Sequence, residues 1–216
     1  MNFRKFDIEN WGRKEHYRYY TEILKVEINI TSNVNVDKFL NCCHKKGYRF
    51  YPALVAVVTE IVNSLEYLRM FRDKDGNLNV WDYVVPNYTF FHKDDHTFSD
   101  LWSEYEKNFD AMYSNIVADM ETYRDVKGIK ARPGQPGNFY CISCAPWIDF
   151  TSLSSRVTNG EPQFFPVITA GKYHDECGRS VMPVNVIIAH AVCDGYHISE
   201  FYAKLQEALD DPEKYM

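Results

Sequence analysis

The sequence lacks the long hydrophobic run and the excess of positive charge on which membrane proteins and nucleic-acid-binding proteins depend. No apolar stretch approaches the ~20 residues that span a bilayer, and the opening M-N-F-R-K leads into no signal-type apolar core. The net charge of −6 argues against a general nucleic-acid surface, because such surfaces need clustered Lys and Arg. We therefore expect a cytoplasmic protein with neither nucleic-acid nor membrane partners.

Several loops that mark large enzyme classes are also missing. Neither G-x-G-x-x-G nor G-x-x-x-x-G-K-S/T occurs, and G-x-S-x-G is absent. Enzymes with a glycine-rich nucleotide loop and ordinary serine hydrolases therefore lose support. With 216 residues, of which 45% are hydrophobic, and no internal repeat, the chain is long enough for one substantial core. We expect a single domain over residues 1–216.

Six cysteines are present, and in a cytosolic chain they are expected to be reduced. Cys141 and Cys144 have C-x-x-C spacing, but they fall in an expected strand. Residues three apart on a strand point to opposite faces, so this pair is not expected to chelate a metal. No metal site is predicted.

Hydrophobic periodicity predicts a mixed α/β chain. Strands are expected where apolar residues alternate or form β-branched runs, at 25–31, 84–91, 139–145, 164–173 and 184–188. Helices are expected where apolar residues recur every three or four positions, at 36–46, 52–63, 99–123 and 197–209, with a short surface helix in 13–20. Asp75-Gly76 predicts a hairpin turn between 68–71 and 78–81. The segment 127–137, rich in Gly and Pro, is interpreted as an internal loop.

The stretch from Val181 to Phe201 organises the chain. Its β-branched strand delivers His190 to the strand end, where Asp194-Gly195 breaks the pattern and a helical period begins. A histidine on rigid backbone beside a turn can serve as a base near pH 7, because the ordinary pKa of imidazole is about 6.5. From local physics alone, a core histidine bonded to a carbonyl is the competing interpretation.

The string H-A-V-C-D-G-Y-H at 190–197 resembles the active-site signature of the chloramphenicol acetyltransferase family. Its core, H-x-x-x-D-G, is shared with the acyltransferase domains of 2-oxo acid dehydrogenase complexes, although this chain shows no lipoyl domain or flexible linker. Five further segments resemble the family in family order: K-F-D-I-E-N-W-G-R-K-E-H, K-G-Y-R-F-Y-P-A-L, F-F-H-K-D-D-H-T-F-S, C-I-S-C-A-P-W-I-D-F and V-I-T-A-G-K-Y.

The resemblance implies the coenzyme A-dependent acyltransferase fold, a two-layer α/β (α+β) sandwich with a mixed sheet and helices on one face. It implies a homotrimer with active sites between subunits, and acetyl-CoA as co-substrate. The implied function is O-acetylation of chloramphenicol by general-base catalysis. The same chemistry on another hydroxyl or amine acceptor, and a binding trimer without catalysis, remain alternatives.

Catalytic roles also follow from the resemblance. His190 corresponds to the base that acts on the acceptor hydroxyl, and Ser143 to a serine that stabilises the oxyanion; an ordinary strand serine is the alternative for Ser143. Thr169 corresponds to a threonine that supports the same intermediate through water. Asp194 is tempting as the partner of His190, but the family pattern pairs it with an arginine, here Arg13, as a buried structural ion pair.

Binding residues are implied in the same way. Tyr20, Leu24 and Phe98 correspond to positions that line the acceptor pocket, although each is otherwise read as ordinary packing. Lys172 corresponds to a lysine in the coenzyme A region, although an isolated lysine after a glycine is usually only solvated.

Three departures from the family pattern alter the acceptor pocket, and a fourth lies beside the catalytic histidine. Asp100 replaces a small apolar residue, Ser155 a leucine, and Cys141 an asparagine near the serine. Ala189 replaces the first, dispensable histidine of the family's H-H pair. The catalytic core is thus intact while the pocket is changed. This favours acetyl transfer as the reaction and leaves chloramphenicol as the acceptor to be tested.

Overall fold

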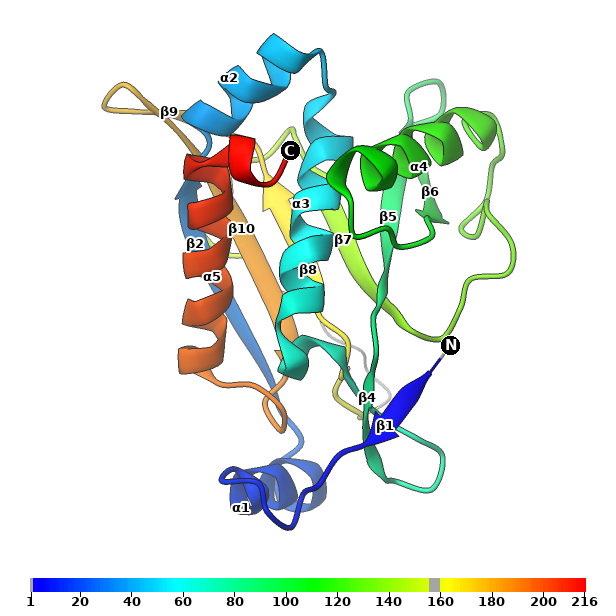
Figure 1. The fold of residues 1–216 in the computed structure, drawn as a ribbon, viewed down its shortest axis with the longest axis vertical. Coiled ribbons are helices and arrows are strands. Elements are labelled where there is room, and N and C mark those ends of the chain that lie inside the picture. The colour runs from blue at the N-terminus through cyan, green and yellow to red at the C-terminus, as the bar shows by residue number, and fades with distance from the viewer. Residues whose placement is uncertain (1, 156–159) are drawn as a thin grey trace.

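The computed structural model describes residues 2–155 and 160–216, which form a layer of helices packed on a β-sheet (Figure 1). The strands are β1 (Phe3–Lys5), β2 (Glu27–Asn35), β3 (Met70–Arg72), β4 (Leu78–Trp81), β5 (Val85–His92), β6 (Thr97–Trp102), β7 (Phe139–Ala145), β8 (Val167–Gly171), β9 (His174–Glu176) and β10 (Arg179–Ala189). The α-helices are α1 (Lys14–Arg18), α2 (Asp37–Lys46), α3 (Phe50–Ser64), α4 (Phe109–Thr122) and α5 (Gly195–Asp210), and a π-helical turn, Tyr19–Ile23, follows α1.

The main sheet is mixed. Its strand order is β2-β10-β8-β7-β5-β6, with β9 paired to β10. The pairs β5·β7 and β7·β8 are parallel, and the other pairs are antiparallel. A second, three-stranded sheet, β1-β4-β3, carries the expected hairpin.

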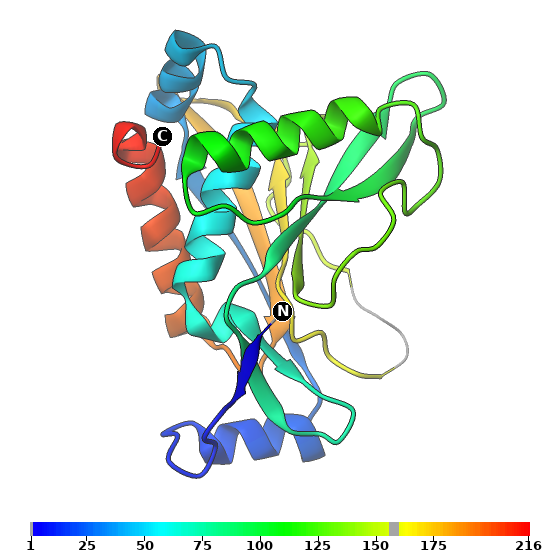
Figure 2. The same cartoon turned by 45° about the vertical axis from the view of Figure 1, so that its right-hand side comes forward.

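Helices cover one face of the main sheet. Figures 1 and 2 show α2, α3, α4 and α5 on the same side. The side chains that point to them, including Tyr88, Ile142, Ile168 and Val186, belong to the buried core. Because successive strand residues point to opposite faces, the strand residues between these core positions define an open face, which no helix in residues 2–155 and 160–216 covers. This is the two-layer mixed-sheet fold that the sequence resemblance implies.

The local sequence explains where these elements begin and end. α2 ends at Gly47, whose φ of +71° is the left-handed conformation that glycine adopts without a Cβ clash. α4 begins after Asn108, whose side-chain oxygen accepts a hydrogen bond from the Ala111 N–H at 3.0 Å. β10 is buried from Val181 to Ala189, as its β-branched run predicts.

The predicted helix over 99–123 is wrong in its first part. Residues 97–102 form strand β6, and the helix begins only at Phe109. The most deeply buried residues in this part alternate, because Ser99, Leu101 and Ser103 are at most 1% exposed while Trp102 is 8% exposed. Two of these three are serines, so a count of hydrophobic residues misses the period of two and registers only the helical spacing that begins at Leu101.

The other predicted elements are present, with boundaries shifted by up to five residues, the largest shift being at the start of β10. The strand expected over 139–145 is β7, the strand expected over 164–173 shortens to β8, and the helix expected over 197–209 starts two residues earlier as α5. Among residues 2–155 and 160–216, no helix is long and apolar enough to cross a membrane.

Candidate active site

His190 lies where β10 ends. Its backbone N–H donates to the Val26 carbonyl at 3.0 Å, which continues the pairing of β10 with β2 by one bond. Its ring Nδ1 lies 2.8 Å from the Cys193 carbonyl oxygen. A carbonyl can only accept, so Nδ1 carries the hydrogen in this bond and a neutral ring keeps its lone pair on Nε2. The bond to a carbonyl that the core-histidine interpretation predicts is therefore present. It leaves Nε2 free to act as a base, and His190 is only half-buried.

Tyr20 fixes the plane of that ring. The two rings stack with centroids 4.0 Å apart and an interplanar angle of 23°. Tyr20 comes from the π-helical turn after α1, so the N-terminal region reaches the end of β10. Tyr20, expected to line the acceptor pocket, thus contacts the candidate base directly.

Arg13 and Asp194 form an ion pair beside His190. Arg13 also donates through Nη2 to the His190 carbonyl at 3.1 Å, so it holds the backbone of the candidate base. The other oxygen of Asp194 accepts from the Tyr196 N–H at 3.0 Å and from His197 Nδ1 at 2.7 Å, which caps α5. Both carboxylate oxygens are occupied, and neither contacts the His190 ring. Side-chain exposures of 14% for Arg13 and 32% for Asp194 make the pair half-buried, less than the sequence led us to expect.

We expect Arg13→Ala and Asp194→Ala to lower the melting temperature. Losing the helix cap costs about 1 kcal/mol and leaving a half-buried partner unsatisfied costs about 1–3 kcal/mol. Asp194→Ala combines both effects, which corresponds to a shift of about 5–15 °C for a chain of this size. Arg18→Ala is the matched control, because its pair with Glu9 is exposed and contributes little. Wild-type melting of both variants would show that Arg13 and Asp194 do not depend on each other.

The same carboxylate predicts a pH dependence. Burial acts to raise the pKa of Asp194, but the hydrogen bond from His197 and the Arg13 charge outweigh it, so the pKa is lowered. A lowered pKa in the folded state stabilises the protein above the unfolded value, about 3.9, and this contribution is lost as the pH falls through the folded value. The difference in melting temperature between wild type and Asp194→Asn should therefore persist above about pH 5 and shrink below about pH 4.

A second group of polar side chains lies on the open face of the sheet. Ser143 on β7 is hydrogen-bonded to Thr89 on β5, with 3.0 Å between the hydroxyl oxygens. Ser143 is in register with Thr169 on β8, which is in register with Asn185 on β10. The neighbours Ile142 and Ile168 point into the core, so this polar row faces away from the helices. Its hydroxyl groups are the donors that a developing oxyanion requires.

One chain does not bring His190 and Ser143 together. His190 lies five residues beyond Asn185, about 17 Å along the strand, and β7 lies two strand spacings, about 10 Å, from β10. The two residues are therefore separated by roughly 20 Å, far beyond hydrogen-bond reach. His190, Tyr20, Arg13 and Asp194 form one group, which we call the histidine group. Ser143, Thr169 and Thr89 form another, which we call the serine group.

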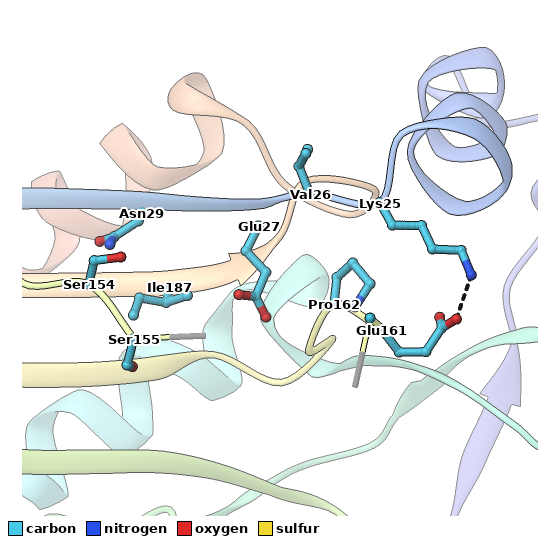
Figure 3. A pocket seen from close by; sticks show the side chains of 10 residues that line it. Lys25, Val26, Glu27, Asn29, Ser154, Ser155, Glu161, Pro162 and Ile187 are labelled. Atoms are coloured by element: carbon cyan, nitrogen blue, oxygen red, sulfur yellow. Dashed lines mark hydrogen bonds and ion pairs between the residues drawn. The ribbon is translucent and has the colours of Figure 1, made fainter. Parts of the chain in front are cut away.

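A cavity of 510 Å³ opens on the open face near the end of β10 (Figure 3). Its lining includes Glu27 from β2, Ile187 from β10 and Lys25, which lies two residues before β2. Ser154 and Ser155 also line it. Glu27 is in register with Ala189, the residue before His190. Ser155, expected to face the acceptor, thus lines a polar cavity that adjoins the histidine group. Leu24, which precedes this lining, is 46% exposed.

The remaining expected binding residues lie on or near the serine group's face. Phe98 is in register with Phe91 and is 49% exposed. Asp100 is in register with Thr89 and forms an ion pair with Lys130 at 2.9 Å. Cys141 lies two residues before Ser143, and burial, assisted by the Asp100 charge, raises the pKa of its thiol to about 12. Such a thiol is not a nucleophile at neutral pH.

Lys172, expected in the coenzyme A region, follows β8 and is exposed to solvent. No cluster of three or more His, Cys, Asp or Glu side chains suited to a metal occurs in the described part of the chain.

Sequence reasoning missed three contributors. Thr89 bonds Ser143, Lys130 pairs with Asp100, and His197 bonds Asp194. Only His197 had a usable signal, because it stands three residues after Asp194, where a capping partner is expected. The register of β5 against β7 and β6 is not readable from the residues.

Comparison with known proteins identifies the family. The family described as "Chloramphenicol acetyltransferase" matches residues 1–206. Chloramphenicol acetyltransferase from Clostridium perfringens is 36% identical over 216 residues, covering 100% of this chain and 99% of that protein. Chloramphenicol acetyltransferase 3 from Escherichia coli is 36% identical over 214 residues, covering 99% and 100%. The chain belongs to the chloramphenicol acetyltransferase family.

Structural neighbours agree on the fold of this family. A solved chloramphenicol acetyltransferase superposes with a TM-score of 0.85 at 24% identity, covering 96% of this chain and all of the other. The cubic core of the pyruvate dehydrogenase multienzyme complex gives a TM-score of 0.66 at 15% identity, covering 93% and 86%. The family match and the two relatives confirm the resemblance drawn from 190–197 and the five other segments, and the protein is an acyltransferase of this family. The matched range, 1–206, includes both the histidine group and the serine group.

Proposed function

We propose that the protein transfers the acetyl group of acetyl-CoA to a hydroxyl of chloramphenicol. Membership of the chloramphenicol acetyltransferase family supports the reaction and the acceptor. The single observation that carries the mechanism is the bond from His190 Nδ1 to the Cys193 carbonyl, because it reserves Nε2 for the acceptor hydroxyl.

The reaction then runs without an acyl-enzyme. His190 Nε2 takes the proton from the acceptor hydroxyl while its oxygen attacks the thioester carbonyl carbon. The negative charge on the former carbonyl oxygen is met by the Ser143 hydroxyl, with Thr169 supporting it through water. The intermediate collapses, the carbon–sulfur bond breaks, and the thiolate of coenzyme A takes the proton back from the imidazolium. The products are an acetyl ester and free coenzyme A.

Arg13, Asp194 and Tyr20 position the base in this mechanism. Arg13 holds the His190 carbonyl, Asp194 anchors Arg13 to the N-terminus of α5, and Tyr20 restricts the imidazole plane. Positioning of this kind contributes to rate because a small displacement of the base lengthens the proton transfer. Leu24, Phe98 and Ser155 contribute to acceptor binding in this proposal, and Lys172 contacts coenzyme A.

The active site belongs to two subunits of a homotrimer in this proposal. The separation of roughly 20 Å between His190 and Ser143 supports it, since one chain cannot place both at one reacting carbon. In a head-to-tail ring the histidine group of one subunit meets the serine group of the next. The trimer should have about three times the chain mass of 25.4 kDa. The cytoplasmic location and a role in antibiotic resistance also stay predictions.

A thiol-release assay tests the proposal. Purified protein is incubated with acetyl-CoA, with and without chloramphenicol, and free thiol and acetylated product are measured. We expect release that depends on chloramphenicol and matches the acetyl ester formed. Release with other hydroxyl or amine compounds, but not chloramphenicol, would favour a different acceptor. If neither chloramphenicol nor any other hydroxyl or amine compound causes thiol release, a binding protein without catalysis would be favoured.

A further inference from the structure

The loop over 127–137 is held against the outer edge of β6. The Asp100 N–H donates to the Ile129 carbonyl at 2.7 Å, and the Ala131 N–H donates to the Asp100 carbonyl at 3.3 Å. Arg132 stacks over the Trp102 ring at 3.9 Å and forms an ion pair with Asp119. The breaker-rich loop is therefore anchored on both sides of Lys130, whose position is fixed.

Lys130 uses only part of its hydrogen-bonding capacity. Its ammonium lies 2.9 Å from an Asp100 oxygen and 3.0 Å from the Gln135 side-chain oxygen. Gln135 is itself held by Asn87 at 2.6 Å. An ammonium has three N–H donors, and the Lys130 side chain is 54% exposed, so one donor remains for a ligand. The carboxylate of Asp100, 19% exposed, supplies an acceptor beside it.

This pair lies within the footprint of a small acceptor bound at Ser143. Asp100 is in register with Thr89, which is hydrogen-bonded to Ser143. Two strand spacings separate β6 from β7, so Asp100 and Ser143 are about 10 Å apart on the same face. The electrostatic influence of both Asp100 and Lys130 on the Cys141 thiol, two residues from Ser143, agrees with this placement.

We infer that the Asp100–Lys130 pair determines acceptor specificity by binding a neutral hydrogen-bonding group, such as an amide, on the acceptor. The inference rests on the proposed function. An amide carbonyl accepts from the free Lys130 donor while an amide N–H donates to Asp100, so both charges stay satisfied. An apolar group at the same place would desolvate the pair with no hydrogen bond in return. Chloramphenicol has one amide of its own, but where its dichloromethyl or nitrophenyl end meets the pair in place of that amide, the pair is desolvated, and we expect a weak acceptor with a high KM.

The test compares chloramphenicol with two analogues that carry a carboxamide in place of the dichloromethyl group or of the nitro group. kcat/KM is measured for each with wild type and with Lys130→Met plus Asp100→Ala. We expect wild type to prefer one of the analogues. In the double variant, kcat/KM for that analogue should fall by roughly 10-fold or more, while the KM for chloramphenicol should fall.

Controls separate specificity from folding. Lys127→Met removes a lysine of the same loop that pairs with Asp94 and Asp95, and it should leave the preference unchanged. Lys130→Met alone should also reduce the preference, so it decides the question if the double variant does not fold. Active variants that keep the wild-type ratio of kcat/KM for the carboxamide analogue to kcat/KM for chloramphenicol would overturn the inference and leave the proposed function intact. If neither wild type nor any variant releases thiol with any of the three acceptors, the proposed function itself would be overturned.

Discussion

His190→Ala is expected to lower kcat by at least ~10²-fold, the low end for a positioned acid or base. The substitution removes Nε2, which we propose to take the acceptor proton. It also removes the bond to the Cys193 carbonyl, but Arg13 still binds the His190 backbone, which alanine retains. Turnover is measured by thiol release at saturating acetyl-CoA.

The loss should come without a change in assembly. The melting temperature and oligomer mass of His190→Ala should stay near wild type, and His44→Ala, an exposed histidine on α2, should keep full activity. A His190→Ala protein that keeps most of its turnover would remove the base, and with it the proposed mechanism.

Ser143→Ala carries the second large effect. We expect kcat to fall by about 10²–10³-fold, the range measured when one oxyanion donor is removed. The fold should tolerate the change, because the hydroxyl of Ser143 bonds only Thr89 among the described residues. Rate constants at saturating substrates report this loss.

Thr89→Val separates orientation from direct stabilisation. This variant keeps the Ser143 hydroxyl and loses the partner that orients it, together with the contact of Thr89 with the Tyr51 hydroxyl, so its kcat should fall by less than that of Ser143→Ala. Equal losses in the two variants would mean that Ser143 acts through Thr89 and does not meet the oxyanion.

The strands and helices that the sequence predicts well are those whose pattern matches their burial. β10 follows from a β-branched run, and α2 from helical spacing that ends at Gly47. The region from residue 99 misleads because its most deeply buried positions include Ser99 in β6 and Ser103 just after it. These serines are hydrogen-bonded to His92 and Tyr88 on the neighbouring strand β5, partners that the hydrophobic pattern does not reveal.

The residues of the candidate site also divide into those that the sequence predicts and those that it does not. His190 stands out in the sequence because a strand, a turn and a helix meet there. Arg13 lies 177 positions away, and only the family resemblance pairs it with Asp194. Lys130 gave no signal, because its role depends on the loop lying along β6. Long-range register thus accounts for most of what sequence reasoning missed.

Mixed oligomers test most directly whether two subunits build each site. His190→Ala and Ser143→Ala proteins, each inactive alone, are unfolded together in equal amounts, refolded and assayed. Each intact site needs His190 from one protein and Ser143 from the other, so roughly one quarter of the sites should recover activity. Recovery to about that level, absent when the proteins are mixed without unfolding, is the predicted result. Wild-type subunits refolded the same way must regain full activity, and mixed oligomers that then stay inactive would contradict a site shared between subunits.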